Sequence, residues 1–192
     1  KLAYLKKIMQ NQRPPRGWYS LRDITADNNN SQIFYISYYK RCDENKWKMS
    51  VLKTEVEDFS TDKITFNDID PFENEQCISK PNSTHSGGRI INFDNQNLLI
   101  TVGDWLMDLA QDDKSIYGKI IKLRKDGKDY NIFSKGHRNP QGLAMINKNY
   151  IFSSEHGHWG GDELNRIIEG ENYGWPIVSY STRGEDQRLN KI

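Results

Sequence analysis

The 192-residue sequence has no apolar run near the roughly 20 residues that a membrane-spanning helix needs, so no membrane span is expected. Net charge is almost absent, because 27 Lys and Arg face 26 Asp and Glu and leave a formal charge of +1. Such a chain has no overall field to recruit nucleic acid or an anionic membrane, and neither is expected as a partner. No secretion signal is visible either, but the sequence begins at Lys1 rather than Met, so that absence excludes nothing.

Cysteine is also scarce, with one residue at Cys42 and one at Cys77. Neither belongs to a Cys-x-x-Cys or Cys/His pattern of the kind that binds zinc. Two alternatives stay open: a disulfide, if the protein is exported, or two free thiols in loops.

Helix signals are weak, and short runs typical of β-strands recur about every ten residues with turn signals between them. Residues 33–38 and 47–56 predict one hairpin, and residues 89–93 and 98–102 predict another. A short amphipathic stretch at 2–9 and a helical turn or two at 105–111 are the helical expectations.

The predicted strands fall into three groups, at about 18–58, 85–124 and 137–180. The residues therefore predict an all-β fold. A period of about 50–60 residues suits the blades of a propeller, although periodicity alone does not separate a propeller from a sandwich.

Polar residues and glycines gather at four predicted strand ends. The clusters are HSGGR at 85–89, TVGD at 101–104, GHRNPQGL at 136–143, and EHGHWGGDELN at 155–165 followed by NYGWP at 172–176. Glycine allows close approach of a ligand, histidine accepts protons near neutral pH, and arginine matches carboxylates. Carbonyl and carboxylate oxygens suit Ca²⁺. A large anionic cofactor with a calcium ion would use this set of groups, but the residue types alone do not specify one.

The motifs GHRNPQGL, EHG..GGDE.N and NYGWP, in this order and spacing, resemble the signature of PQQ-dependent aldose sugar dehydrogenases in the glucose/sorbosone dehydrogenase family. The HSGGR and TVGD…AQD…YGK runs are similar too, and the resemblance covers about residues 18–180. It implies a six-bladed β-propeller with about three blades present, so that 1–192 is a partial propeller domain. We therefore expect a piece of a longer protein that alone binds PQQ poorly and turns over slowly or not at all.

The resemblance also implies an activity. The family oxidises the anomeric hydroxyl of an aldose sugar to a lactone, passes hydride to PQQ, and uses calcium to anchor the cofactor. The expected partners are thus a small sugar and an external electron acceptor, in the periplasm or outside the cell, with dimer formation left open.

Individual roles carry over by position. His85 matches the catalytic base, and the residues matching the PQQ pocket are Arg138, Asn139 and Gln141. The carbonyls of Gly157 and His158 match the active-site calcium ligands, although the family usually has proline where His158 stands. Glu163 and Tyr173 match a second, structural calcium site.

Structural alternatives stand beside these roles: a turn histidine for His85, an ion pair for Arg138, and a hydrogen bond and a core aromatic for Glu163 and Tyr173. Asp104 and Asp112 are expected to cap turns, with support of the pocket as the alternative, and the Trp-Pro pair at 175–176 is expected to pack a blade. A non-catalytic, ligand-binding propeller of the same family is the alternative function, and a purely structural propeller is a third.

Overall fold

The computed structural model describes residues 21–58, 60, 63–69, 71–79 and 83–179. The amphipathic stretch expected at 2–9 lies outside these residues. In the described part the regular elements are β-strands and two 3₁₀ turns, η1 (Asn74–Gln76) and η2 (Ser83–His85). No helix among these residues has the length and apolarity to cross a membrane.

Three antiparallel sheets follow one another along the chain. The first contains β1 (Leu21–Ala26), β2 (Ile33–Arg41), β3 (Lys46–Asp58) and β4 (Lys63–Asp68), with the short β5 (Ile78–Ser79) paired to β3. The second contains β6 (Gly87–Asn92), β7 (Asn97–Val102), β8 (Lys119–Arg124) and β9 (Tyr130–Lys135). The third contains β10 (Pro140–Asn147), β11 (Tyr150–Glu155) and β12 (Glu163–Ile167).

Both expected hairpins are confirmed, since β2 pairs with β3 and β6 pairs with β7. The second sheet runs further than the expected group at 85–124, because β9 belongs to it. Polar residues such as Asn131 and Ser134 interrupt the apolar pattern of β9, so the sequence did not mark it as a strand. The helical turn expected at 105–111 is wrong. Trp105, Leu106 and Asp108 have positive φ, which a right-handed helix does not allow.

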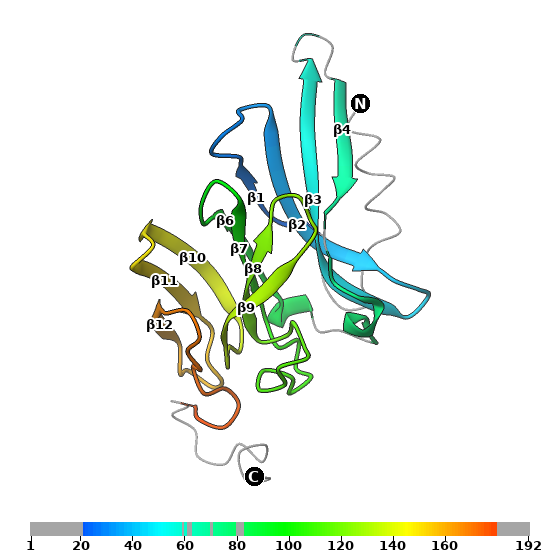
Figure 1. Ribbon diagram of the computed structural model, residues 1–192. Helices are drawn as coiled ribbons and strands as arrows, with labels where there is room; N and C mark the ends of the chain where they lie inside the picture. Colours follow the sequence, from blue (N-terminus) through cyan, green and yellow to red (C-terminus); the bar gives the residue numbers. More distant parts are fainter. Residues whose placement is uncertain (1–20, 59, 61–62, 70, 80–82, 180–192) are drawn as a thin grey trace.

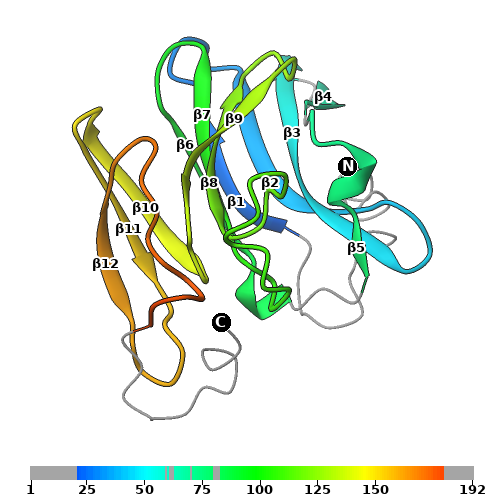
Figure 2. The same ribbon diagram turned by 60° about the horizontal axis from the view of Figure 1, so that its bottom comes forward.

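The sheets lie side by side in chain order, with the β6–β9 sheet between the other two (Figures 1 and 2). Their first strands, β1, β6 and β10, are neighbours. Each sheet therefore presents its first strand to the others and its later strands outward, as the blades of a propeller do.

One apolar core lies between the first and second sheets and another between the second and third, so the middle sheet contributes side chains to both. On β7, Leu98 and Ile100 face the first sheet, where they pack with Tyr39 and Met49. Leu99, between them, faces the third sheet and packs with residues that include Ile151. Both faces of β7 and β8 are buried, which explains why LLITV and KIIKL read as continuous apolar runs rather than alternating ones.

Cys42 and Cys77 form a disulfide with a Cα–Cα distance of 6.3 Å across 35 residues of sequence. It links the turn between β2 and β3 to the segment just before β5. The structure thus decides between the two alternatives left open for the cysteines.

Candidate active site

The polar motifs converge at one set of strand ends. His85 ends η2, two residues before β6, Arg138 lies just before β10, and His156 and Gly157 follow β11. Gly103, which follows β7, makes this convergence possible, because a Cβ there would lie 2.1 Å from the His85 carbonyl oxygen. The site residues therefore lie in loops at the strand ends of the second and third sheets, and the hydrogen bonds between the strands fix where each loop begins.

Arg138 is the centre of this cluster. Its Nη1 donates to the carbonyl oxygens of His156 at 2.9 Å and Gly157 at 2.7 Å, and its Nη2 lies 2.9 Å from Nε2 of His85. The side chain is largely buried, with 9% of the residue exposed. The expected grouping of His85, Arg138 and Gly157 in one place is thus what the structure contains.

The contact between Arg138 and His85 defines the imidazole tautomer. A guanidinium can only donate, so Nε2 of His85 must be the acceptor, with its lone pair directed at Arg138. The proton then lies on Nδ1, which is 2.9 Å from the hydroxyl oxygen of Thr84. In this arrangement Arg138 occupies the Nε2 lone pair of His85, so a substrate hydroxyl would have to replace that contact before Nε2 could act as a general base.

Trp175 packs against the Arg138 guanidinium, and Asp104 holds Trp175 in place. The guanidinium carbon lies 5.3 Å from the centre of the Trp175 ring, within cation–π range. The indole Nε1 donates to Asp104 Oδ2 at 2.6 Å, and Asp104 Oδ1 accepts from the backbone of Leu106 at 2.9 Å. Burial raises the pKa of the Asp104 carboxyl to about 6.

Sequence reasoning offered support of the pocket only as the alternative for Asp104 and did not identify Trp175 as its partner. Asp104 does cap a turn, as expected, but it also holds Trp175, which was read as blade packing alone. A signal was present: TVGD and NYGWP both belong to the motif set that carries the resemblance, although they lie some 70 residues apart.

Asn139 and Gln141 serve the scaffold. Asn139 Nδ2 donates to the Thr84 carbonyl at 3.0 Å, and its Oδ1 accepts from Gly87 N at 3.3 Å and from Gln141 Nε2 at 2.7 Å. These bonds join the start of β6 to the start of β10. The contact of Asn139 and Gln141 with a cofactor stays a prediction. In this structure Asn139 is 2% exposed, and its hydrogen bonds go to other residues of the chain.

The predicted metal ligands divide into two groups. The Gly157 carbonyl lies at the Arg138 cluster, and the ring of His158 lies 6.2 Å from that of Trp175. Glu163 lines a small cavity together with Glu155 and Gly157. Tyr173 does not line that cavity, since its ring stacks on His137 with the centroids 4.7 Å apart. Within the described ranges, no three His, Cys, Asp or Glu side chains gather into a group that could hold a metal.

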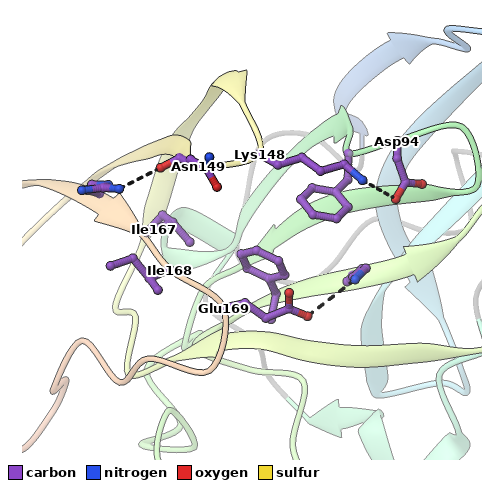
Figure 3. Close-up of a pocket in the computed structure, with 10 residues that line it drawn as sticks. Asp94, Lys148, Asn149, Ile167, Ile168 and Glu169 are labelled. Carbon is purple, nitrogen blue, oxygen red and sulfur yellow. Dashed lines mark hydrogen bonds and ion pairs between the residues drawn. The ribbon is translucent and has the colours of Figure 1, made fainter.

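A separate groove of about 510 Å³ lies at the opposite strand ends, between the second and third sheets (Figure 3). Lys148 pairs with Asp94 at 3.3 Å, and Lys122 pairs with Glu169 at 3.5 Å, each pair crossing from one sheet to the next. Each of these pairs joins a positive to a negative side chain, so the charges in the groove offset one another. The groove lies at the other ends of the strands from His85 and Arg138.

Three antiparallel sheets packed face to face define part of a β-propeller, and the polar cluster at one set of strand ends is its candidate site. Residues 17–191 match the family described as Glucose / Sorbosone dehydrogenase, and the chain belongs to that family.

Relatives agree with this assignment. The chain is 37% identical to Aldose sugar dehydrogenase YliI of Escherichia coli over 112 residues, which are 50% of this chain and 30% of that protein. It is 33% identical to Quinoprotein glucose dehydrogenase B of Acinetobacter calcoaceticus over 126 residues, covering 50% and 26%. The PQQ-bound form of aldose sugar dehydrogenase from Streptomyces coelicolor superposes with a TM-score of 0.72 at 28% identity, covering 88% of this chain and 51% of that one. The chain thus spans about half of that structure, and the partial-propeller fold is confirmed.

Proposed function

We propose that this chain contributes the base and part of the cofactor site to a PQQ-dependent aldose sugar dehydrogenase, which oxidises the anomeric hydroxyl to a lactone. The observation that carries the proposal is the placement of Arg138 between Nε2 of His85 and the carbonyl of Gly157. Two relatives, a quinoprotein glucose dehydrogenase and a PQQ-bound aldose sugar dehydrogenase, support the choice of cofactor.

The donor set fits the proposed groups. PQQ is a tricarboxylate, and the forked guanidinium of Arg138 suits a carboxylate or quinone oxygen. The carbonyl oxygens of His156 and Gly157 are hard ligands of the type that calcium prefers. The carbonyl of His158, on the same loop, is the other ligand that we propose. Histidine at position 158, where the family usually has proline, still provides a backbone carbonyl oxygen. Without proline the φ angle at this position is no longer fixed by a ring.

The reaction assigns one task to each residue. His85 Nε2 takes the proton from the anomeric hydroxyl once the bound sugar has replaced its contact with Arg138, while Nδ1 stays beside the Thr84 hydroxyl. Arg138 and Trp175 form one wall of the site and orient bound groups. When bound, PQQ supplies the two-electron acceptor that takes the hydride from the sugar C1. Repeated turnover would require an external electron acceptor.

The test is a reconstitution of the complete protein that contains this chain with PQQ and excess calcium, followed by addition of glucose. Reduction of the quinone, seen in its absorbance, is the expected result. His85→Asn should slow that reduction by about 10²–10⁴-fold while PQQ binding persists. Absence of PQQ uptake by the wild-type protein would end the proposal.

One observation favours a second function, a non-catalytic propeller that binds a ligand. Arg138 already engages both the histidine and the carbonyls, so the cluster is complete as a structural network. In that case His85→Asn would change stability alone, and glucose would leave a bound quinone unreduced.

We also propose that the protein works in the periplasm or outside the cell. The disulfide between Cys42 and Cys77 supports an oxidising compartment, because such bonds rarely persist in the cytosol. Alkylation of thiols in protein taken from its native source, followed by mass spectrometry, should find both cysteines protected until reduction.

A further inference from the structure

A buried pair of side chains lies directly behind the site. Nδ1 of His137 is 2.6 Å from Oε1 of Glu155, and both side chains are almost wholly shielded from solvent. In the chain, His137 immediately precedes Arg138, and Glu155 immediately precedes His156. The pair therefore joins the two loops at the residues next to the guanidinium and the carbonyls that it binds.

The imidazole of His137 is fixed on its other sides as well. Its Nε2 lies 2.8 Å from the Ser134 hydroxyl, and its ring stacks on Tyr173 with an interplanar angle of 25°. Glu155 Oε1 also accepts from Asn165 Nδ2 at 3.2 Å. Neither side chain can rotate without breaking a second buried contact, which costs about 1–3 kcal/mol for each polar group left unsatisfied.

Backbone pairing between β10 and β11 is irregular where the two strands approach the site, so it fixes these strand ends less firmly than the middle of the sheet. The pairing of β10 with β11 shifts register between Pro140 and Gly142, close to the site. Beyond the shift, a backbone bond of 3.1 Å from His156 N to Asn139 O continues the connection. The His137–Glu155 bond bridges the same two segments at the point where the ladder is irregular.

We propose that His137 and Glu155 are positioning residues that set the distance between Arg138 and the carbonyl oxygens of His156 and Gly157. The pair does not touch the proposed substrate or cofactor. Its effect on cofactor affinity rests on the proposed function, whereas its effect on loop geometry does not.

Hydrogen exchange of the backbone amides of His156 and Gly157 tests the geometric claim without any ligand. These amides donate to Asn139 O and to Asp162 Oδ1 at 2.9 Å, so exchange reports on the loop itself. Glu155→Ala should raise their exchange rates at least tenfold. Glu155→Gln keeps an acceptor for His137 and should restore most of the protection, whereas His137→Phe, which keeps a ring on Tyr173, should not.

Ile151→Val on the same strand is the matched control, because it weakens the apolar core without reaching the site. Exchange is compared under denaturant conditions that give the variants equal global stability. Equal rates at 156–157 in Glu155→Ala and Ile151→Val would overturn the proposal. If Glu155→Ala does not fold, Glu155→Asp, which retracts the carboxylate by one methylene, takes its place with the same expectation.

PQQ titration in the presence of calcium separates this inference from the proposed function. Glu155→Ala should bind PQQ about tenfold more weakly than wild type, and Ile151→Val should match wild type. If no variant and no wild-type protein binds PQQ, the proposed function fails, while the exchange rates still decide the positioning role.

Discussion

Nη1 of Arg138 donates a 2.7 Å hydrogen bond to the carbonyl oxygen of Gly157. The resemblance assigns that same oxygen to calcium, so a guanidinium and a divalent cation would share one acceptor. Two cations this close repel each other strongly in a partly buried site. An anionic group between them would relieve the repulsion, which makes binding of calcium and of a polycarboxylate mutually supportive.

Arg138→Met tests this relationship, because methionine keeps an apolar stem against Trp175 and removes the charge. Without PQQ, the variant should bind calcium about tenfold more tightly than wild type. With calcium present it should bind PQQ about 10–100-fold more weakly, since a charge-assisted hydrogen bond contributes about 1.5–3 kcal/mol. Isothermal titration measures both affinities.

Arg166→Met is the control for this experiment. Arg166 donates to Asn149 at the opposite strand ends, at 3.0 Å, and carries the same charge. It should leave both affinities unchanged. Calcium binding that is no tighter in Arg138→Met than in wild type contradicts the shared-acceptor interpretation.

Asp104→Asn should change how stability depends on pH. The folded-state pKa of Asp104 is about 6 and its ordinary value 3.8, so between these values the folded state holds a proton that the unfolded state has lost. The contribution of Asp104 to stability therefore falls as pH rises from about 4 to about 6, by about 3 kcal/mol. Asparagine does not titrate, and its one side-chain oxygen replaces only one of the two carboxylate oxygens that accept from Trp175 and Leu106, so the substitution also has a cost that does not vary with pH.

Urea unfolding of both proteins at several pH values checks this expectation. The stability of Asp104→Asn relative to wild type should improve between pH 4 and pH 7. A difference that stays constant across this range would show that the carboxyl does not titrate there.

Gly103→Ala should displace His85. A Cβ at this position would lie 2.1 Å from the His85 carbonyl oxygen and 2.7 Å from its carbon, so backbone has to move. Overpacking of this kind costs about 1–3 kcal/mol. Gly170, whose Cβ would meet nothing within 4 Å, provides the control as Gly170→Asn, because asparagine tolerates its φ of +86°. Equal unfolding midpoints for the two variants would argue against the crowding at His85.

Reduction of the disulfide should destabilise the first sheet. Closing a loop of 35 residues stabilises a fold by about 4 kcal/mol on the chain-entropy estimate. The Cys42→Ser/Cys77→Ser double variant and dithiothreitol-treated wild type should therefore unfold at a similar, lower urea concentration than oxidised protein. A midpoint unaffected by dithiothreitol would mean that the bond does not form in solution.

The sequence predicted the strands that are apolar or alternating, such as β2, β3 and β7, because burial imposes a pattern on them. It missed β9, whose partly polar run does not look like a strand, and it placed a helical turn at 105–111 where several residues have positive φ. The site residues His85, Arg138 and Gly157 could be named because each lies in a glycine-rich motif. The motifs contain Asp104, Trp175, His137 and Glu155, but which of these residues meet could not be predicted, because the local sequence does not report a partner on another strand.

By itself the sequence determined the all-β class, the main hairpins and the identity of the polar motifs, since these depend on side-chain periodicity and turn chemistry within short segments. The packing of successive sheets decided the rest: that strand ends from residues 85, 138 and 157 meet, that Cys42 reaches Cys77, and that one guanidinium bridges an imidazole and two carbonyls. Those are contacts between distant segments, and they exist because two apolar cores hold the sheets at fixed separations.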